Sequence, residues 1–582
     1  MWKLLSYMKA YKKEAVCAPL FKLLEALFEL FVPLVMARII DVGIANSDQP
    51  YIVKMCLLMS ALGLIGLVCS ITAQYFSAKA AVGFAAKLRH ELFAHIQSLS
   101  FSEMDVQGTS TLITRMTSDI NQVQSGVNLF LRLFMRSPFI VFGAMIMAFT
   151  IDRKAAMIFV VVIPILCVIV FGIMLASIPL YRKVQERLDQ VTRMTRENLQ
   201  GIRVIRAFRQ EQQEAAAFDE GNAALVKIQV LSGRISAMMN PLTYVVVNGG
   251  LIVLLYVGAI RVDGGWITQG AVVALVNYMS QILVELVKLA NLIINVTKAI
   301  ACGNRIQSVM EIEPSIQSAE IGSAEKAEAV SGEKEVPKVE FDHVMFRYKE
   351  AGADSLTDLT FRVQKGETVG IIGGTGSGKS SLVSLIPRFY DVREGSVKID
   401  GKDVRSYDLQ QLRGKVGIVM QKAVLFSGTI RENLLWGNEN ATEEQLRAAI
   451  HAAQADEVVF EGKGGLDAVV EQEGRNFSGG QKQRLTIARA LVRNPEILIL
   501  DDSASALDFA TDAKLRKAIR ELSKSMTVFI VSQRASTIQY ADQILVLDDG
   551  ELVGCGRHEE LLKNCEVYQE TYYSQFPKEE AE

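Results

Sequence analysis

Long apolar stretches dominate the chain up to about residue 296. A helix needs about 20 mostly apolar residues to cross the hydrocarbon core of a membrane. Six stretches are long enough: 16–40, 55–76, 129–150, 155–180, 238–260 and 271–296. Six such helices in succession are improbable in the core of a soluble protein. The pattern therefore predicts an all-α transmembrane domain of six helices.

The positions of the basic residues predict how these helices cross the membrane. Loop 41–51 contains no Lys or Arg, whereas the polar segments after the second and fourth spans contain several. Because Lys and Arg concentrate on the cytoplasmic side, both segments and both termini of this cell-membrane protein are predicted to be cytoplasmic. Helical spacing over 81–98 and 181–230 predicts that the helices continue beyond the membrane, with turns near 101–110 and 201–207. The residues before the first span predict an amphipathic helix on the membrane surface.

Charged residues at membrane depth form two pairs, each one helical turn apart. They are Glu25 with Glu29, and Glu285 with Lys288. Charges in this position are costly and face a cavity or a partner. Two interpretations stay open. In one, the acidic pair attracts cationic amphiphiles in a substrate cavity, and in the other the charges make structural contacts with Arg132, Arg136 or a partner subunit.

The composition changes between residues 311 and 338. This segment is acidic, rich in Ala, Ser and Lys and poor in aromatic residues, which is typical of an exposed linker. We therefore expect a transmembrane domain over 1–310, a linker over 311–338 and a second domain over 339–582.

Short aliphatic runs alternate with helical patterns in the second domain. Strands are expected at 368–372, 415–420, 497–501, 527–532 and 543–547, and helices at 380–388, 481–492 and 511–522. Strands that alternate with helices indicate an α/β domain with a mainly parallel sheet. The chain is therefore predicted to be multidomain, with an all-α membrane part followed by an α/β part.

A glycine-rich segment follows the first of these strands and opens a helix. It consists of Gly373, Gly374, Thr375, Gly376, Ser377, Gly378, Lys379 and Ser380, followed by Ser381. This is the context of a phosphate-binding loop, in which backbone N–H groups and the helix N-terminus surround the phosphates of ATP. Lys379 should reach the β- and γ-phosphates, and the Ser380 hydroxyl should bind Mg²⁺. The buried strand 497–501 ends in Asp501, a position suited to hold the same ion.

A third segment makes the chain resemble a known family. Phe477, Ser478, Gly479, Gly480 and Gln481 resemble the signature sequence of ATP-binding cassette (ABC) exporters, and the resemblance covers essentially the whole chain. It implies that this segment caps an ATP held by the nucleotide-binding domain of another chain, so that a head-to-tail dimer encloses two ATPs. The domain order is that of the exporters in the family. The implied activity is an ATPase coupled to transport, with ATP and Mg²⁺ as its ligands.

The resemblance also implies roles for single residues. Tyr348 corresponds to the aromatic residue that stacks on adenine. Gln421 corresponds to the glutamine that senses Mg²⁺ and faces the membrane domain. Asp508, with Ser505, corresponds to the loop that crosses the dimer interface.

Two residues depart from the family pattern where hydrolysis is performed. Asp502 stands where the family has a glutamate that polarises the attacking water, and Gln533 stands where it has a histidine that contacts the γ-phosphate. Aspartate is shorter by one methylene, and glutamine cannot carry a proton. The chain's own site should bind ATP and hydrolyse it slowly, while its intact signature completes a competent site on the partner. The pattern is similar to bacterial heterodimeric multidrug exporters, so the expected partner is a second, different half-transporter.

The net charge and the cysteine spacing do not identify the substrate. A net charge of −2 gives no reason to expect a nucleic-acid partner, and the seven cysteines have no metal-binding spacing. The function predicted is ATP-driven export of amphipathic small molecules, drugs or lipids, across the cell membrane. A peptide exporter and a non-transporting ATP-binding regulator are the alternatives, although six spans and an intact signature weigh against the regulator.

Overall fold

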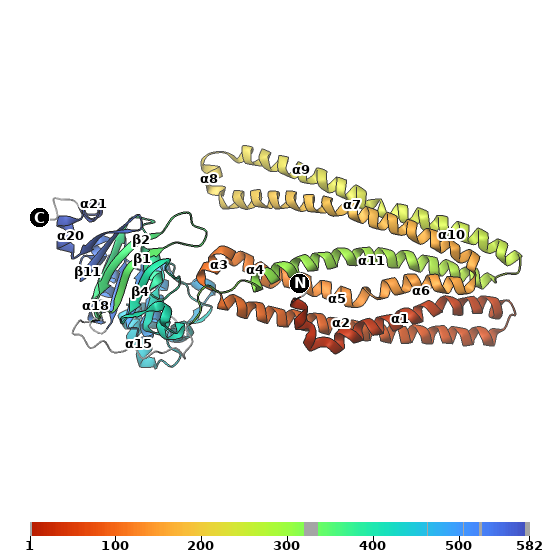
Figure 1. Cartoon of the computed structure of the whole chain (residues 1–582), viewed down its shortest axis with the longest axis horizontal. Helices are drawn as coiled ribbons and strands as arrows, with labels where there is room; N and C mark the ends of the chain where they lie inside the picture. The colour runs from red at the N-terminus through yellow and green to blue at the C-terminus, as the bar shows by residue number, and fades with distance from the viewer. Residues whose placement is uncertain (1–2, 319–335, 462–463, 504–505, 523–525, 577–582) are drawn as a thin grey trace. The chain divides into compact units, whose positions relative to one another are not determined.

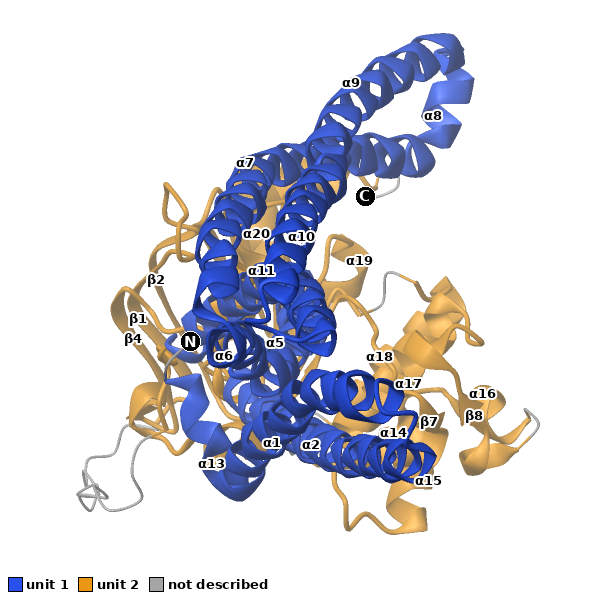
Figure 2. Ribbon diagram, turned by 90° about the vertical axis from the view of Figure 1, so that its right-hand side faces the viewer, with its two compact units in different colours: residues 1–97, 110–312 blue, residues 98–109, 313–582 orange. Residues whose placement is uncertain are grey.

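A computed structural model of the chain describes residues 3–318, 336–461, 464–503, 506–522 and 526–576. These residues form two compact units, which Figure 2 shows in different colours. Unit 1 comprises residues 1–97 and 110–312, and unit 2 comprises residues 98–109 and 313–582. Each unit is described by itself.

The described residues of unit 1 form helices joined by short turns, as predicted (Figure 1). Its elements are η1 (Leu4–Tyr11), α1 (Lys12–Arg38), η2 (Ile39–Ile44), α2 (Gln49–Ser98), α4 (Thr109–Thr114), η3 (Arg115–Asp119), α5 (Ile120–Leu133), α6 (Arg136–Ile151), α7 (Arg153–Gln200), α8 (Ile202–Ala207), α9 (Glu211–Ala237), α10 (Met239–Asp263) and α11 (Gln269–Met310). The predicted extensions are present, since α2 has 50 residues and α7 has 48. These lengths exceed what a membrane crossing requires.

Five helical stretches are long and apolar enough to cross a membrane by length and composition. They lie within Gln49–Ser98, Thr109–Ile151, Arg153–Gln200, Glu211–Asp263 and Gln269–Met310. Helix α1, which contains the predicted first span, is not among them because it carries Lys22, Glu25 and Glu29. Its place in the bundle follows from its packing instead, since Ala26 and Leu30 belong to the same buried cluster as Phe159 and Tyr278.

The charged residues of the two predicted pairs gather around one arginine, Arg136. The Arg136 guanidinium donates to Glu285 at 2.8 Å and to Glu29 at 2.7 Å. Glu285 also accepts from Ser137 Oγ and Lys288 Nζ, each at 2.8 Å. These are the structural contacts of the second interpretation. A buried charge that is paired in this way avoids most of the desolvation cost of an isolated one.

The residues before the first span form a 3₁₀ helix, η1. Leu4 is buried, and a Cβ atom added at Gly83 of α2 would lie 2.2 Å from the Tyr11 ring. Lys3 pairs with Glu311 at 2.6 Å. The apolar side of this segment therefore packs on helix α2, because a glycine leaves room for the tyrosine ring.

The main sheet of unit 2 contains every strand predicted from the sequence. Its order is β12-β11-β3-β10-β9-β6. The strands are β3 (Thr368–Gly373), β6 (Val416–Val419), β9 (Ile497–Asp501), β10 (Thr527–Val531), β11 (Gln543–Asp548) and β12 (Glu551–Gly556). The first five pair in parallel, and β12 pairs antiparallel with β11 at the edge. The predicted α/β fold with a mainly parallel sheet is confirmed.

A second sheet and a group of short helices complete unit 2. The sheet has the order β2-β1-β4-β5 and contains β1 (Val339–Phe346), β2 (Leu356–Val363), β4 (Glu394–Ile399) and β5 (Lys402–Asp403), while β7 (Gly428–Thr429) pairs with β8 (Val469–Val470). The helices are α3 (Phe101–Gln107), α12 (Lys379–Leu385), η4 (Val404–Ser406), α13 (Leu409–Lys415), α14 (Ile430–Leu435), α15 (Glu443–Ala452), α16 (Asp456–Phe460), η5 (Gly465–Asp467), η6 (Gln472–Gly474), α17 (Gly479–Val492), α18 (Phe509–Leu522), α19 (Ala535–Ile538), α20 (His558–Asn564) and α21 (Glu566–Tyr573). The second sheet packs on the main one through a core that includes Phe341, Phe346 and Phe529.

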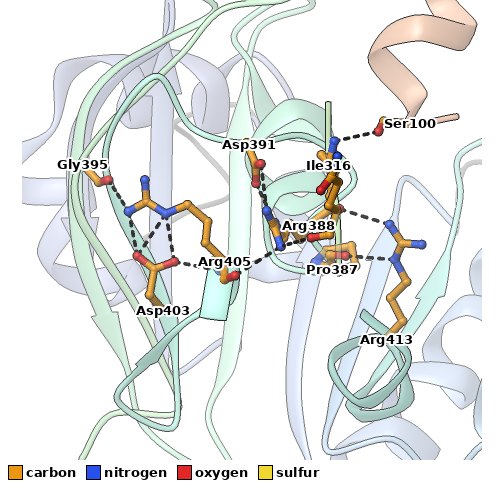
Figure 3. Close-up of polar contacts among 10 residues, drawn as sticks. Ser100, Ile316, Pro387, Arg388, Asp391, Gly395, Asp403, Arg405 and Arg413 are labelled. Atoms are coloured by element: carbon orange, nitrogen blue, oxygen red, sulfur yellow. Dashed lines mark hydrogen bonds and ion pairs between the residues drawn. The ribbon is translucent and has the colours of Figure 1, made fainter. Parts of the chain in front are cut away.

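Unit 2 includes the short helix α3 and the first residues of the predicted linker. The backbone N–H of Ile316 donates to Ser100 Oγ at 3.0 Å, and the Arg388 guanidinium donates to the Gln317 carbonyl at 3.2 Å (Figure 3). Two further N–H groups of Arg388 bind Asp391 at 2.7 and 3.0 Å. The segment 313–318 is therefore a strap that is fixed to α3 on one side and to the two-sheet fold of unit 2 on the other.

Helix α3 also contacts that fold directly. The Phe101 ring lies 4.7 Å from the Phe389 ring, and the Tyr390 hydroxyl donates to Asp105 at 2.7 Å. Glu103 is buried and accepts from the Ser315 hydroxyl at 3.3 Å. Although burial raises the pKa of the Glu103 carboxyl, the hydrogen bonds from Ser315 lower it further, so the net shift is downward.

Candidate functional site

The phosphate-binding loop, Asp501, Asp502 and Gln533 come together in one cleft of unit 2. The cleft has a volume of about 350 Å³. It lies at the carboxyl ends of β3, β9 and β10, where ligands of open parallel sheets bind. Its lining residues are Tyr348, Ser355, Thr375, Gly376, Gly378, Lys379, Ser380, Ser381, Gln421, Asp501, Asp502, Val531, Ser532 and Gln533.

The loop between β3 and α12 requires glycine at particular positions. Gly376 and Gly378 have φ of +88° and +90°, which other residues rarely adopt. A Cβ atom at Gly378 would lie 2.6 Å from Leu356 and 2.8 Å from the Ser355 carbonyl. At Gly374 and Gly376 an added Cβ atom would meet nothing within 4 Å, so these two glycines leave their backbone open to a ligand.

Lys379 starts helix α12 and points back into its own loop. Its Nζ donates to the Gly374 carbonyl at 2.6 Å and to the Gly373 carbonyl at 3.0 Å. Burial lowers the pKa of Lys379, against the attraction of Asp502 and Asp501. Lys379 Nζ also donates to Ser377 Oγ at 3.3 Å. A buried ammonium that is held by such neutral groups gains most from an anion such as a phosphate.

Ser380 and Asp501 form the candidate magnesium site. The Ser380 hydroxyl donates to Asp501 Oδ1 at 3.0 Å. Burial, together with the neighbouring charge of Asp502, raises the pKa of Asp501. Hydroxyl and carboxylate oxygens are suitable ligands for Mg²⁺, and a divalent cation would compensate the buried negative charge. These residues therefore fit the ion, whose role is to neutralise charge on the phosphates.

Asp502 follows the strand in a strained backbone conformation. Its φ is +45°, in the left-handed region, and its N–H donates to the Val531 carbonyl at 3.0 Å. The Gln421 side-chain amide donates to Asp502 Oδ2 at 3.4 Å, and Gln483 donates to the Asp502 carbonyl at 3.2 Å. Strain of this kind is kept where the surrounding contacts enforce it, as at an active site. Gln483 was not singled out from the sequence, because a polar residue inside a helix has no distinguishing pattern.

Gln533 lies in the loop that follows strand β10. Its side chain is exposed and lines the cleft. The Gln575 side chain, two residues after the end of helix α21, holds this loop with both ends of its amide. Its Nε2 donates to the Gln533 carbonyl at 2.8 Å, and its Oε1 accepts from the Ala535 N–H at 2.9 Å. The sequence gives no signal for Gln575, because 42 residues separate it from Gln533.

Tyr348 lines the same cleft, and its hydroxyl lies 2.8 Å from Ser381 Oγ. Its ring contacts Tyr390 edge-on, with centroids 5.2 Å apart. Stacking on adenine stays a prediction for this residue.

The signature residues line a different cleft of unit 2. Ser478, Gly479, Gly480, Gln481 and Asp508 lie there, with Arg484. Phe477 packs beside them against a core cluster. Ser478 is the N-cap of α17, accepting from the Gln481 N–H, while Gln481 accepts from the Ser478 N–H. None of the residues that line this cleft lines the first one. Asp508 accepts from the Thr511 N–H at 2.9 Å, and Ser505, which the resemblance pairs with it, lies outside the described residues.

Comparisons with known proteins match both parts of the chain. Residues 16–286 match the family model "ABC transporter transmembrane region" and residues 356–505 the model "ABC transporter". An uncharacterized ABC transporter ATP-binding protein of Bacillus subtilis, YfiB, is 37% identical over 582 residues, covering 100% of both chains. The chain belongs to the ABC transporter family.

Other relatives agree with this assignment. An uncharacterized ABC transporter ATP-binding protein of Mycobacterium tuberculosis is 36% identical over 98% of this chain and 97% of its own length. The putative multidrug export ATP-binding/permease protein YgaD of Bacillus subtilis is 34% identical over 97% of both chains. A bacterial Atm1-family ABC exporter solved with ATP bound has the same fold, with a TM-score of 0.78 and 24% identity over 97% of this chain and 99% of that one. This ABC transporter is thus a multi-pass membrane protein with an ATP-hydrolysing domain.

Proposed function

We propose that this chain is one half of a heterodimeric exporter of amphipathic small molecules, and that its own ATP site binds ATP but hydrolyses it slowly. The observation that carries the proposal is the composition of the first cleft. Asp502 and Gln533 line it together with an intact phosphate-binding loop. The site therefore has the groups for binding and lacks the family's groups for hydrolysis.

The two departures act on hydrolysis for different reasons. Aspartate is about 1 Å shorter in reach than glutamate, and a misplacement of about that size can lower a rate roughly a hundredfold. Gln533 can donate a hydrogen bond but cannot carry a proton. Lys379, Ser380 and Asp501, which would hold the phosphates and Mg²⁺, keep the expected residue types. Binding should therefore survive.

The second cleft supports a role toward a partner chain. Because it shares no lining residue with the first cleft, the segment from Phe477 to Gln481 is available to cap a nucleotide held elsewhere. A glycine-rich helix N-terminus is suited to bind a γ-phosphate. A homodimer would contain two slow sites, whereas a partner with its own glutamate and histidine would supply one competent site completed by this signature.

The observations on the substrate concern its chemical class and do not single out one compound. The name of the relative YgaD mentions multidrug export. Glu285 and Glu29 are bound to Arg136, so the acidic groups of the bundle serve in part to hold helices together. In this proposal residues 1–310 form the transmembrane domain, 339–582 the nucleotide-binding domain, and both termini are cytoplasmic.

Restoring the two missing groups tests the proposal. In a forced homodimer of the full chain, which has two intact signatures, Asp502→Glu combined with Gln533→His should raise ATP hydrolysis by about a hundredfold or more, because each positioning contact contributes several kcal/mol to the barrier. The affinity for ATP, measured by equilibrium binding, should change little.

The control is the pair Asp548→Glu and Gln539→His, which makes the same changes outside the cleft. It should leave hydrolysis at the level of the unmodified homodimer. If the unmodified homodimer already hydrolyses ATP at a rate typical of enzymes, about 10 per second, the slow-site proposal is wrong.

A further inference from the structure

A row of aromatic side chains in unit 2 leads from the first cleft to helix α3. Tyr348, which lines the cleft, meets the Tyr390 ring edge-on, with centroids 5.2 Å apart and ring planes at 83°. The Tyr390 ring lies 6.2 Å from the ring of Phe101 in α3. Phe346, on strand β1, contacts both tyrosines, at 4.7 and 5.5 Å. Aromatic pairs at such separations attract one another beyond simple burial, so the row is held together along its length.

Hydrogen bonds fix both ends of this row. The Tyr348 hydroxyl lies 2.8 Å from Ser381 Oγ of helix α12. The Tyr390 hydroxyl donates to Asp105 of α3 at 2.7 Å. Burial and this hydrogen bond raise the pKa of the Tyr390 hydroxyl, so it stays protonated and keeps donating at neutral pH. Neither ring can swing about its Cα–Cβ bond without losing its hydrogen bond.

A second contact joins α3 to the same segment of the chain. Lys349 follows Tyr348, and its Nζ lies 3.6 Å from Glu103 Oε1. Glu103 is buried, and its other carboxylate oxygen accepts from the Ser315 hydroxyl. A buried carboxylate that is paired in this way is costly to separate from its partners. Helix α3 therefore holds residue 348 through Tyr390 and residue 349 through Glu103.

The position of the Tyr348 ring decides how well it can stack on a base. A side chain that becomes ordered only when a ligand binds reduces the affinity by the entropy that it loses. A ring that its neighbours already hold in place avoids this loss. The contacts of Tyr390 and Asp105 should therefore act on the binding of the nucleobase, although neither residue lines the cleft.

We propose that Tyr390 and Asp105 are positioning residues for the nucleobase: by holding Tyr348, they make the affinity for adenine depend on helix α3. Coupling between two sites is reciprocal, so the bound base should in turn hold α3 in place. The inference rests on the predicted contact between Tyr348 and adenine, and it is independent of slow hydrolysis at Asp502 and Gln533. Helix α3 belongs to the segment of unit 2 that interrupts unit 1 in the sequence, so base binding is coupled to that segment.

Calorimetric titration of the full chain tests this with two ligands that share the phosphates. One is the non-hydrolysable ATP analogue adenosine imidotriphosphate, and the other is tripolyphosphate, which has no base. Tyr390→Phe and Asp105→Ala should each weaken binding of the ATP analogue about fivefold or more, and should leave the affinity for tripolyphosphate unchanged. The double variant should lose no more than either single one, because both substitutions remove the same hydrogen bond.

The matched control is Tyr407→Phe. The Tyr407 hydroxyl donates to the Ile399 carbonyl at 2.8 Å outside the first cleft, so this variant also removes a buried hydrogen bond of a tyrosine. It should bind both ligands as the wild type does. An equal loss for tripolyphosphate in Tyr390→Phe, or additive losses in the double variant, would overturn the proposal.

Tyr348→Ala separates this proposal from the prediction on which it rests. If Tyr348→Ala weakens binding of the ATP analogue and Tyr390→Phe does not, the positioning role is wrong and the adenine contact stands. If neither variant weakens it, the adenine contact itself is wrong, and the positioning role falls with it.

A second measurement needs no variant. A saturating concentration of the ATP analogue should slow deuterium exchange in peptides from 101–107 about fivefold in the wild-type chain, and saturating tripolyphosphate should not. In Tyr390→Phe the ATP analogue should lose this effect. Protection of α3 that is equal with both ligands would show that the base plays no part in it, and would contradict the proposal even if the variants failed to fold.

Discussion

The two clefts of unit 2 differ in how closely their residues match the pattern of the ABC exporter family. The cleft of the phosphate-binding loop contains Lys379, Ser380 and Asp501, together with Asp502 and Gln533 at the two positions that depart from the family pattern. The signature cleft has the complete segment from Phe477 to Gln481, with Ser478 and Gln481 capping helix α17 reciprocally. In the function proposed here, binding of ATP at the chain's own cleft and capping of the partner's ATP are separate properties of one domain, so each can change independently.

The largest effect is expected in the signature cleft. Ser478→Arg removes the N-cap of α17 and adds a bulky cation, so ATP hydrolysis by the dimer should fall at least about a hundredfold. ATP binding to the chain's own loop should persist. Gln472→Arg, at an exposed position outside both clefts, is the control and should keep full activity. Near-normal hydrolysis by Ser478→Arg would refute the cross-chain role.

Lys379→Ala should affect the other cleft. Removing an ammonium that contacts phosphates should weaken ATP binding to this chain about ten- to a hundredfold, because charge-assisted hydrogen bonds contribute about 1.5 to 3 kcal/mol. Equilibrium binding of a fluorescent ATP analogue to the full chain measures this. Lys365→Ala, which removes an exposed lysine, should bind normally. An unchanged affinity for ATP in Lys379→Ala would show that Lys379 does not contribute to binding the phosphates.

Asp501→Asn separates stability from ligand binding. The folded protein holds the pKa of Asp501 above its unfolded value, so the charged form destabilises the fold at neutral pH, and this cost disappears as the pH falls below about 4. The variant should therefore unfold at a higher temperature than the wild type at pH 7 without nucleotide, by a few degrees, and the difference should vanish in acid. Thermal stabilisation by MgATP should be lost.

Asp548→Asn is the matched control, since this exposed aspartate ends strand β11 of the same sheet. It should change neither the melting temperature nor its response to MgATP. If Asp501→Asn is stabilised by MgATP as strongly as the wild type, Asp501 does not hold the metal ion.

The smallest effect is expected from Gln575→Ala. Loss of its two hydrogen bonds should free the loop that carries Gln533, and the Ala535 amide should exchange with deuterium roughly tenfold faster. The affinity for ATP should fall a fewfold. Gln569→Ala removes an amide of helix α21 that donates to the Leu562 carbonyl instead, and it should leave this loop unchanged. Equal exchange at Ala535 in wild type and Gln575→Ala would show that other contacts hold the loop.

The sequence predicts most of the parallel sheet and little of what surrounds it. Buried parallel strands are continuous aliphatic runs, as in 497–501, and the glycine-rich loop has a fixed spacing. The strands β1, β2 and β4 were missed, because their alternating pattern is interrupted by register shifts. Gln575 and Gln483 could not be found, since a single amide becomes meaningful only when the fold brings it to a backbone group.

The membrane part shows the same limit. Helix lengths and the apolar pattern were predictable, but the two interpretations of Glu29 and Glu285 could not be separated by sequence. Their shared partner, Arg136, lies 107 and 149 residues away from them. Pairing over such separations is a property of the packed bundle.

The strap of residues 313–318 has a consequence for recombining these proteins. Ile316 is bound to Ser100, Ser315 to Glu103, and Tyr390 to Asp105, so a stretch from early in the chain is built into the nucleotide-binding fold. The fold is therefore not one interchangeable module that starts at a single cut. A chimera that joins this fold to the helices of another transporter has to include residues 98–109 along with residues from 313 onward. Otherwise the other transporter's counterpart of 98–109 would have to contact a strap and a domain to which its side chains are not matched.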